Sequence, residues 1–142
     1  MPIKLTTEQI RYISLFESIT GAMAADCVIF DEFNLIIFVV KPGHLGLAIG
    51  RGGVNIRRLK KFLNRNIKVI EYSDDPKKFL ENSMYPANIR SIRISKRDNK
   101  KIAIVEVDPK DKGMVIGKNG KNIQQIRYLA KRYFNLENVV VV

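Results

Sequence analysis

The 142-residue sequence contains one cysteine, one histidine and no tryptophan. A single cysteine, Cys27, excludes an intramolecular disulfide bond, and its apolar neighbours favour a buried thiol. The single histidine, His44, has no clustered acidic residues around it, which favours a surface position over a metal ligand or a catalytic residue. We therefore expect no enzyme activity, no metal, no cofactor and no small-molecule substrate.

Long apolar segments are also missing from the chain. The longest strong candidate, residues 35–40, has the length of a strand and is far too short to cross a membrane. Residues 1–5 lack the apolar core of a signal peptide. We expect a cytoplasmic protein that makes no membrane contact.

Positive charge, by contrast, is abundant. The net charge is +11 and the pI is about 9.9, in a chain with 46% hydrophobic residues, which is typical of a globular protein. Residues 1–74 carry 10 basic and 7 acidic side chains, or +3, whereas residues 75–142 carry 15 and 7, or +8. The second half is thus the stronger electrostatic partner for a polyanion, although charge alone also fits a plain solvated surface.

One nine-residue pattern occurs twice. The sequence A-I-G-R-G-G-V-N-I at residues 48–56 returns as V-I-G-K-N-G-K-N-I at residues 115–123, an offset of 67 residues. At the same offset Leu59 meets Ile126 and Arg65 meets Arg132. The chain therefore resembles two copies of one unit of about half its length.

Each glycine pair lies between two segments whose apolar residues recur at helical spacing. Glycine accepts positive φ and lets a ligand approach the backbone closely, and the second helix presents its positive dipole end at the same place. Arg51 and Lys118 add a mobile positive charge there. We therefore predict an anion-binding link in each copy. Arg57, Arg58 and Lys121 lie within about a turn of the links and favour nucleic-acid contact, whereas Lys60, Lys61 and Arg132 fit a plain surface.

The remaining patterns predict the same element order in both copies. Thr6 and Gln9 form a capping-box signature for a first helix that ends near Gly21. Strands are expected at 25–30, 35–40 and 67–72 in the first copy and at 89–95, 102–107 and 139–142 in the second, with a helix at 76–82 and two helices around each glycine link. We therefore predict an α+β fold of order α-β-β-α-α-β in each of two domains, residues 1–74 and 75–142. Because each half is small and the linker is short, we expect the halves to pack together as a rigid pair.

The two glycine links resemble the GXXG loop of the KH domain, which clamps about four single-stranded nucleotides. The element order resembles the type II KH fold, a three-stranded mixed sheet covered by helices on one face. The resemblance implies these RNA-binding residues: Gly50, Arg51, Gly52, Gly53, Asn55, Arg57, Arg58, Gly117, Lys118, Asn119, Gly120, Lys121 and Asn122. It also implies an apolar groove formed by Ile49, Ile56, Ile116 and Ile123, although core packing is the preferred interpretation of Ile56 and Ile123. Gly52 replaces the usual polar or basic residue, which predicts a weaker grip on phosphate in the first loop.

Tandem type II KH units over the whole chain, with L-T-T-E-Q-I-R-Y-I-S-L-F-E-S-I-T-G-A at residues 5–22, are similar to the archaeal NusA-like transcription factors. The resemblance implies single-stranded RNA as the partner and a role in transcription elongation, termination or antitermination, with RNA polymerase as a candidate second partner. Bacterial relatives add a polymerase-binding region and an OB-type domain, and we expect neither within these 142 residues. Two alternatives stay open: an RNA-binding KH protein of the ribosome or of ribosome assembly, and a pair in which one degenerate copy serves only as a scaffold.

Overall fold

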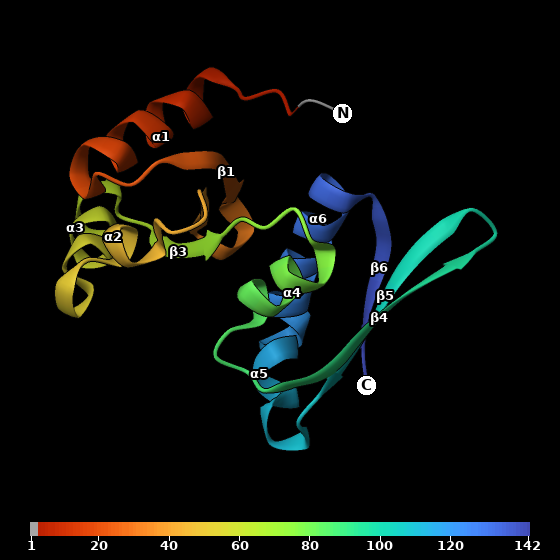
Figure 1. Ribbon diagram of the computed structural model, residues 1–142. Coiled ribbons are helices and arrows are strands. Elements are labelled where there is room, and N and C mark those ends of the chain that lie inside the picture. Colours follow the sequence, from red (N-terminus) through yellow and green to blue (C-terminus); the bar gives the residue numbers. More distant parts are fainter. Residues whose placement is uncertain (1–2) are drawn as a thin grey trace. The chain divides into compact units, whose positions relative to one another are not determined.

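The computed structural model describes residues 3–142 (Figure 1). Met1 and Pro2, which belong to the segment considered above for a signal peptide, lie outside the described residues. Internal contacts divide the chain into two compact units between Tyr72 and Ser73. The sequence patterns placed this boundary two residues later, at Asp74 and Asp75.

The first unit contains three helices and a three-stranded sheet. In chain order its elements are α1 (Thr7–Thr20), β1 (Ala24–Phe30), β2 (Leu35–Val40), α2 (Leu45–Ile49), α3 (Val54–Leu63) and β3 (Asn66–Glu71), with 3-10 turns at η1 (Asp31–Phe33) and η2 (Arg51–Gly53). The central strand β2 pairs antiparallel with β1 and parallel with β3. The predicted mixed sheet is confirmed.

The second unit repeats this order. Its elements are α4 (Pro76–Met84), β4 (Ile89–Arg97), β5 (Lys100–Val107), α5 (Lys112–Ile116), α6 (Lys121–Phe134) and β6 (Leu136–Val141), with 3-10 turns at η3 (Pro109–Asp111) and η4 (Lys118–Gly120). The central strand β5 pairs antiparallel with β4 and parallel with β6. The predicted α-β-β-α-α-β order is confirmed in both units.

Local sequence signals explain where the first helix of each unit begins. The Thr6 hydroxyl accepts a hydrogen bond from the Gln9 backbone, and the Gln9 side chain accepts one from the Thr6 backbone, so the predicted capping box is present. Helix α1 then ends at Gly21, which has the left-handed conformation. In the second unit, the Asp75 carboxylate caps α4 by accepting from the Lys77 backbone, with Pro76 at the first helical position.

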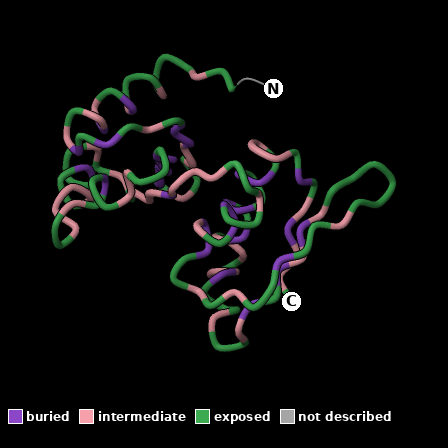
Figure 2. Tube along the Cα trace, in the orientation of Figure 1, coloured by how far each residue is buried: buried purple, intermediate pink, exposed green. Residues whose placement is uncertain are grey.

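Each unit has its own apolar core between the helices and one face of the sheet (Figure 2). In the first unit, Phe16 of α1 stacks on Phe38 of β2 with ring centroids 4.3 Å apart. In the second, Phe79 of α4 meets the edge of Tyr133 of α6 at 5.2 Å. The first contact holds α1 on the sheet, and the second joins α4 to α6, the helix that follows the second glycine link.

The two copies differ by one helical turn. Helix α3 has 10 residues and α6 has 14, and the two helices end at equivalent left-handed caps, Asn64 and Asn135. These caps are 71 residues apart, whereas the glycine links are 67 apart, so α6 carries four extra residues. The sequence match of Arg65 with Arg132 is therefore wrong as a structural equivalence: Arg132 lies inside α6, and Arg65 lies beyond the cap of α3.

Candidate nucleic-acid interface

The two glycine links have one backbone conformation. The first glycine has φ 77° and ψ 165° at Gly50, and φ 78° and ψ 169° at Gly117. The third residue is left-handed in both loops, with φ 62° at Gly52 and φ 57° at Asn119. Because glycine and asparagine are the residues that accept this region most readily, Gly52 differs from Asn119 in its side chain and not in its backbone.

An asparagine side chain links the two helices on either side of each loop. The Asn55 Nδ2 atom donates to the carbonyl oxygen of Leu47 at 2.9 Å, and Asn122 Nδ2 donates to that of Met114 at 2.8 Å. Each bond joins the helix before the loop to the helix after it. One N–H group of each asparagine amide is therefore used within the protein itself, which gives both residues a positioning role that the sequence interpretation as RNA contacts did not include.

Positive charge gathers where the second helix begins. The side chains of Arg51, Lys118 and Lys121 are exposed, and none of the three takes part in an ion pair within residues 3–142. Gly53 and Gly120 are the N-cap residues of α3 and α6, and neither helix has a side-chain hydrogen bond at its cap. The positive dipole end and the mobile cation thus coincide, an arrangement that attracts phosphate.

The two arginines that follow the first loop have different surroundings. The Arg57 guanidinium turns back and donates to the carbonyl oxygen of Gly52 at 2.5 Å, so its charge stays beside the loop. Arg58 instead lines a surface hollow with Ile19, Lys61 and Phe62. Sequence spacing placed both arginines within a turn of the loop, but their helical positions direct them to different faces of α3.

The four isoleucines predicted to form an apolar groove differ in how far they are buried. Ile123 is only 4% exposed and belongs to the core of the second unit, as its core interpretation expected. Ile116 is half-buried and packs against that same core, and Ile56 is half-buried in the first unit. Ile49 is exposed at 38%. Ile49 and Ile116, which directly precede the first glycine of each loop, thus combine apolar surface with a place at the loop entrance, and Ile56 also keeps part of its surface exposed.

His44 and Cys27, the residue types most often used in catalysis or metal binding, lie in structural positions in the first unit. His44 Nδ1 accepts a hydrogen bond from the backbone of Met23 at 2.9 Å, and Cys27 is buried and is not part of a disulfide bond. Within residues 3–142, no three His, Cys, Asp or Glu side chains gather in a way that could hold a metal ion.

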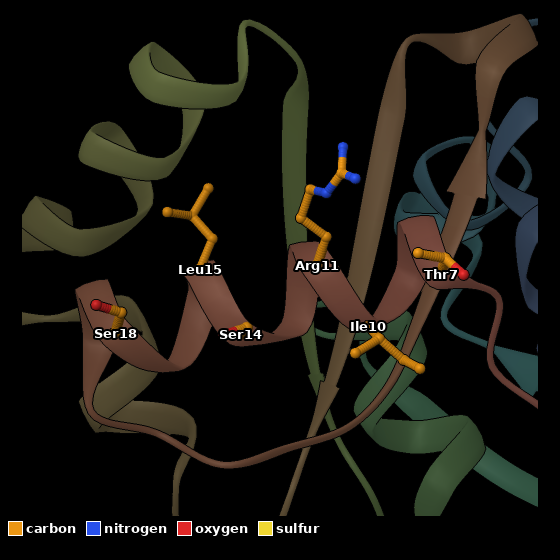
Figure 3. Close-up of a pocket in the computed structure, with 6 residues that line it drawn as sticks. All are labelled: Thr7, Ile10, Arg11, Ser14, Leu15 and Ser18. Carbon is orange, nitrogen blue, oxygen red and sulfur yellow. The ribbon is translucent and has the colours of Figure 1, made fainter.

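A second surface hollow follows α1 of the first unit (Figure 3), and none of its residues belongs to a glycine loop. It is lined by Thr7, Ile10, Arg11, Ser14, Leu15 and Ser18.

None of the helices formed by residues 3–142 has the length and apolar character that a membrane crossing requires.

Comparisons with known proteins identify both units as KH domains. Residues 10–74 match the model of the KH domain family, and residues 76–140 match the model described as NusA-like second KH domain. The chain is 40% identical, over its full length and 81% of the relative, to a "Probable transcription termination protein NusA" of Methanococcus vannielii. It is 32% identical to the protein of that name in Halococcus morrhuae, with 98% of both chains covered. A solved structure described as "Crystal structure of APE1850" shares 41% identity and a TM-score of 0.87, covering 97% of this chain and 100% of that one.

Proposed function

Because the chain belongs to the archaeal NusA family and consists of two tandem KH domains, we propose that it binds single-stranded RNA through both glycine loops and acts in transcription termination. The observation that carries this proposal is the repetition of one loop conformation, with an exposed cation and an uncapped helix start, at two places 67 residues apart.

The loop geometry suits a phosphate backbone. Left-handed residues at Gly52 and Asn119 keep the loop close to the start of the next helix. A phosphate that approaches this turn meets the positive helix end and then the side chain of Arg51 or Lys118. Bases that follow that phosphate would lie beside Ile49 or Ile116, where van der Waals contact with an aliphatic side chain selects no particular base.

The test replaces Lys118 and Asn119 by aspartate. Both positions are exposed, and aspartate accepts the left-handed conformation of Asn119, so the fold is expected to survive. We expect affinity for single-stranded RNA to fall at least tenfold, because the change places two carboxylates where phosphate would bind. Fluorescence anisotropy measures the affinity, and circular dichroism checks the fold.

A matched control removes the same amount of charge elsewhere. Lys77→Asp with Lys78→Gln also lowers the net charge by three, on an exposed part of α4. It should leave RNA affinity nearly unchanged. Equal affinity of the folded loop variant and the unmodified chain would show that the second loop is not an RNA site.

RNA polymerase is the partner we propose beyond RNA, on the basis of the relatives' role in termination. Pull-down from an archaeal extract with the tagged chain should recover polymerase rather than small ribosomal particles. Recovery of ribosomal particles alone would instead support the ribosome-associated alternative.

A further inference from the structure

The hairpins of the two copies have opposite charge. The β4–β5 hairpin, residues 89–107, carries six basic and two acidic side chains, or +4. The equivalent β1–β2 hairpin, residues 24–40, has no basic side chain and three acidic ones, or −3. This difference of seven charges exceeds the whole difference of five between the two halves of the chain. The positive excess of the second copy is therefore concentrated in one hairpin.

The charged part of the β4–β5 hairpin extends past the third strand. Pairing of β4 with β5 continues to Arg97 and Lys100, whereas pairing of β5 with β6 begins only at Lys101 and Leu136. A two-residue turn closes the hairpin at Asp98 and Asn99, both with positive φ. Residues 96–101 are all exposed, and Arg97 to Lys100 continue past the residue of β5 at which its pairing with β6 begins. Figures 1 and 2 show the end of the hairpin projecting past β6.

The charges occupy both faces of the ribbon. Residues directly opposite each other in the ladder share a face, so Arg97 lies with Lys100 on one face and Lys96 with Lys101 on the other. Arg93 belongs to the same face as Arg97, since alternate strand residues point the same way. Within residues 3–142, none of these five side chains forms an ion pair, and Asp98 is the single acidic residue at the tip.

The tip lies at the opposite end of α6 from the second glycine loop. The loop immediately precedes the first residue of α6, whereas Lys101 pairs with Leu136, just beyond the last. A helix of 14 residues is about 21 Å long. Because the loop and the hairpin tip lie at opposite ends of this helix, we expect the roughly four nucleotides held at the loop to leave the tip unoccupied.

We propose that the β4–β5 hairpin is a second RNA-binding surface, which contacts phosphate groups of RNA outside the short segment held by the glycine loops. This inference rests on the proposed function. RNA suits the tip better than an acidic protein does, because residues 96–101 include no apolar or aromatic side chain. Protein interfaces depend on such side chains at their centre, whereas phosphate contacts need only cations and are independent of base sequence.

The experiment uses the full chain with Lys96, Arg97, Lys100 and Lys101 each replaced by glutamine. Affinity is measured over several salt concentrations for a tetranucleotide and for an RNA of 24 nucleotides. Each phosphate contact on a single strand contributes about 0.7 to the salt slope, so the variant should lose up to about 2.8 in slope with the long RNA. Its affinity for the tetranucleotide should not change. The control Lys77→Gln with Lys78→Gln should leave both affinities and both slopes unchanged.

Three results would overturn the inference without affecting the proposed function, provided that the unmodified chain binds the tetranucleotide. The first is an unchanged slope with the long RNA. The second is an equal loss of salt slope per removed charge in the control variant, which would show that the loss depends only on the net charge of the chain. The third is unchanged RNA binding together with loss of an acidic protein partner in pull-down. Failure of the unmodified chain to bind either RNA would instead overturn the proposed function.

Discussion

The glycines of the two loops have different physical roles, although the sequence pattern treats them alike. Gly50 and Gly117 combine a φ near 78° with an extended ψ, a region that is almost restricted to glycine. A Cβ atom at either position would lie 2.8 Å from the Cγ atom of the asparagine that links the two helices. Gly52 is different, because nothing lies within 4 Å of the place where its Cβ would be.

We therefore predict that Gly117→Ala lowers the free energy of unfolding by about 1–3 kcal/mol, since the new methyl group meets Asn122 in a strained backbone. The measurement is urea denaturation followed by circular dichroism. The matched variant Gly52→Asn recreates the residue of the second loop in an open, left-handed position and should stay within about 0.5 kcal/mol of the unmodified chain. Equal stability of the two variants would contradict this assignment of roles.

Asn55 and Asn122 show what a residue pattern leaves undetermined. Their recurrence two residues after each GXXG sequence was visible in the chain, and it indicated a shared role. An asparagine can equally donate to a nucleotide or to a backbone carbonyl, and only the fold brings the carbonyls of Leu47 and Met114 to within 2.9 Å. The residues were thus predictable, whereas their contacts were not.

At the scale of elements, the sequence predicted helix starts better than strand limits. The capping signals at Thr6 and Asp75 are local and act through hydrogen bonds within three residues, so they appear in the structure as expected. Strand β6 begins at Leu136, three residues before the prediction. Glu137 and Asn138 have low strand preference, but the register with β5 overrides it.

An ion pair joins the end of α6 to β6, and its pH response is testable. Lys131 Nζ donates to Glu137 Oε1 at 2.5 Å, and this bond lowers the pKa of Glu137 below its ordinary 4.5, with a smaller contribution from the charge of Lys100. The stabilising effect of the pair is therefore present above pH 4.5 and is lost as the pH falls through the lowered pKa.

We predict that Lys131→Gln raises the pKa of Glu137 towards 4.5, because the variant removes the ammonium group that stabilises the carboxylate. The pKa is measured by NMR from the chemical shift of the Glu137 side-chain carboxyl carbon as a function of pH. Lys77→Gln, which removes a lysine from α4, should leave the midpoint where it was. An unchanged midpoint in the Lys131 variant would show that the ion pair does not persist in solution.

At the scale of the whole molecule, the repeat at an offset of 67 residues, together with the local patterns in each copy, predicted the fold class and the order of elements in both units. It could not predict the extra turn of α6, because the added residues continue the helical pattern without interruption. Nor did counting charge by halves show that the excess lies in a hairpin that extends past its sheet. That required the strand register, which depends on pairing between residues distant in sequence.

The presence of two loops in one chain predicts how RNA length controls binding. A tetranucleotide should bind twice per chain, once at each loop, whereas a longer RNA that spans both loops should bind once and much more tightly. The gain arises because the second contact becomes intramolecular, and linked sites of this kind typically gain about 10²–10⁴ in affinity. Isothermal titration with RNAs of increasing length measures both the stoichiometry and the gain.

The control must separate the contribution of the first loop from that of the β4–β5 hairpin, since either would favour longer RNA. Arg51→Asp with Gly52→Asp disables only the first loop, and aspartate accepts the left-handed conformation at Gly52. We expect this variant to bind one tetranucleotide with unchanged affinity and to lose most of the gain with long RNA. If long RNA binds the variant as tightly as it binds the unmodified chain, the first KH unit does not hold RNA and serves as a scaffold for the second.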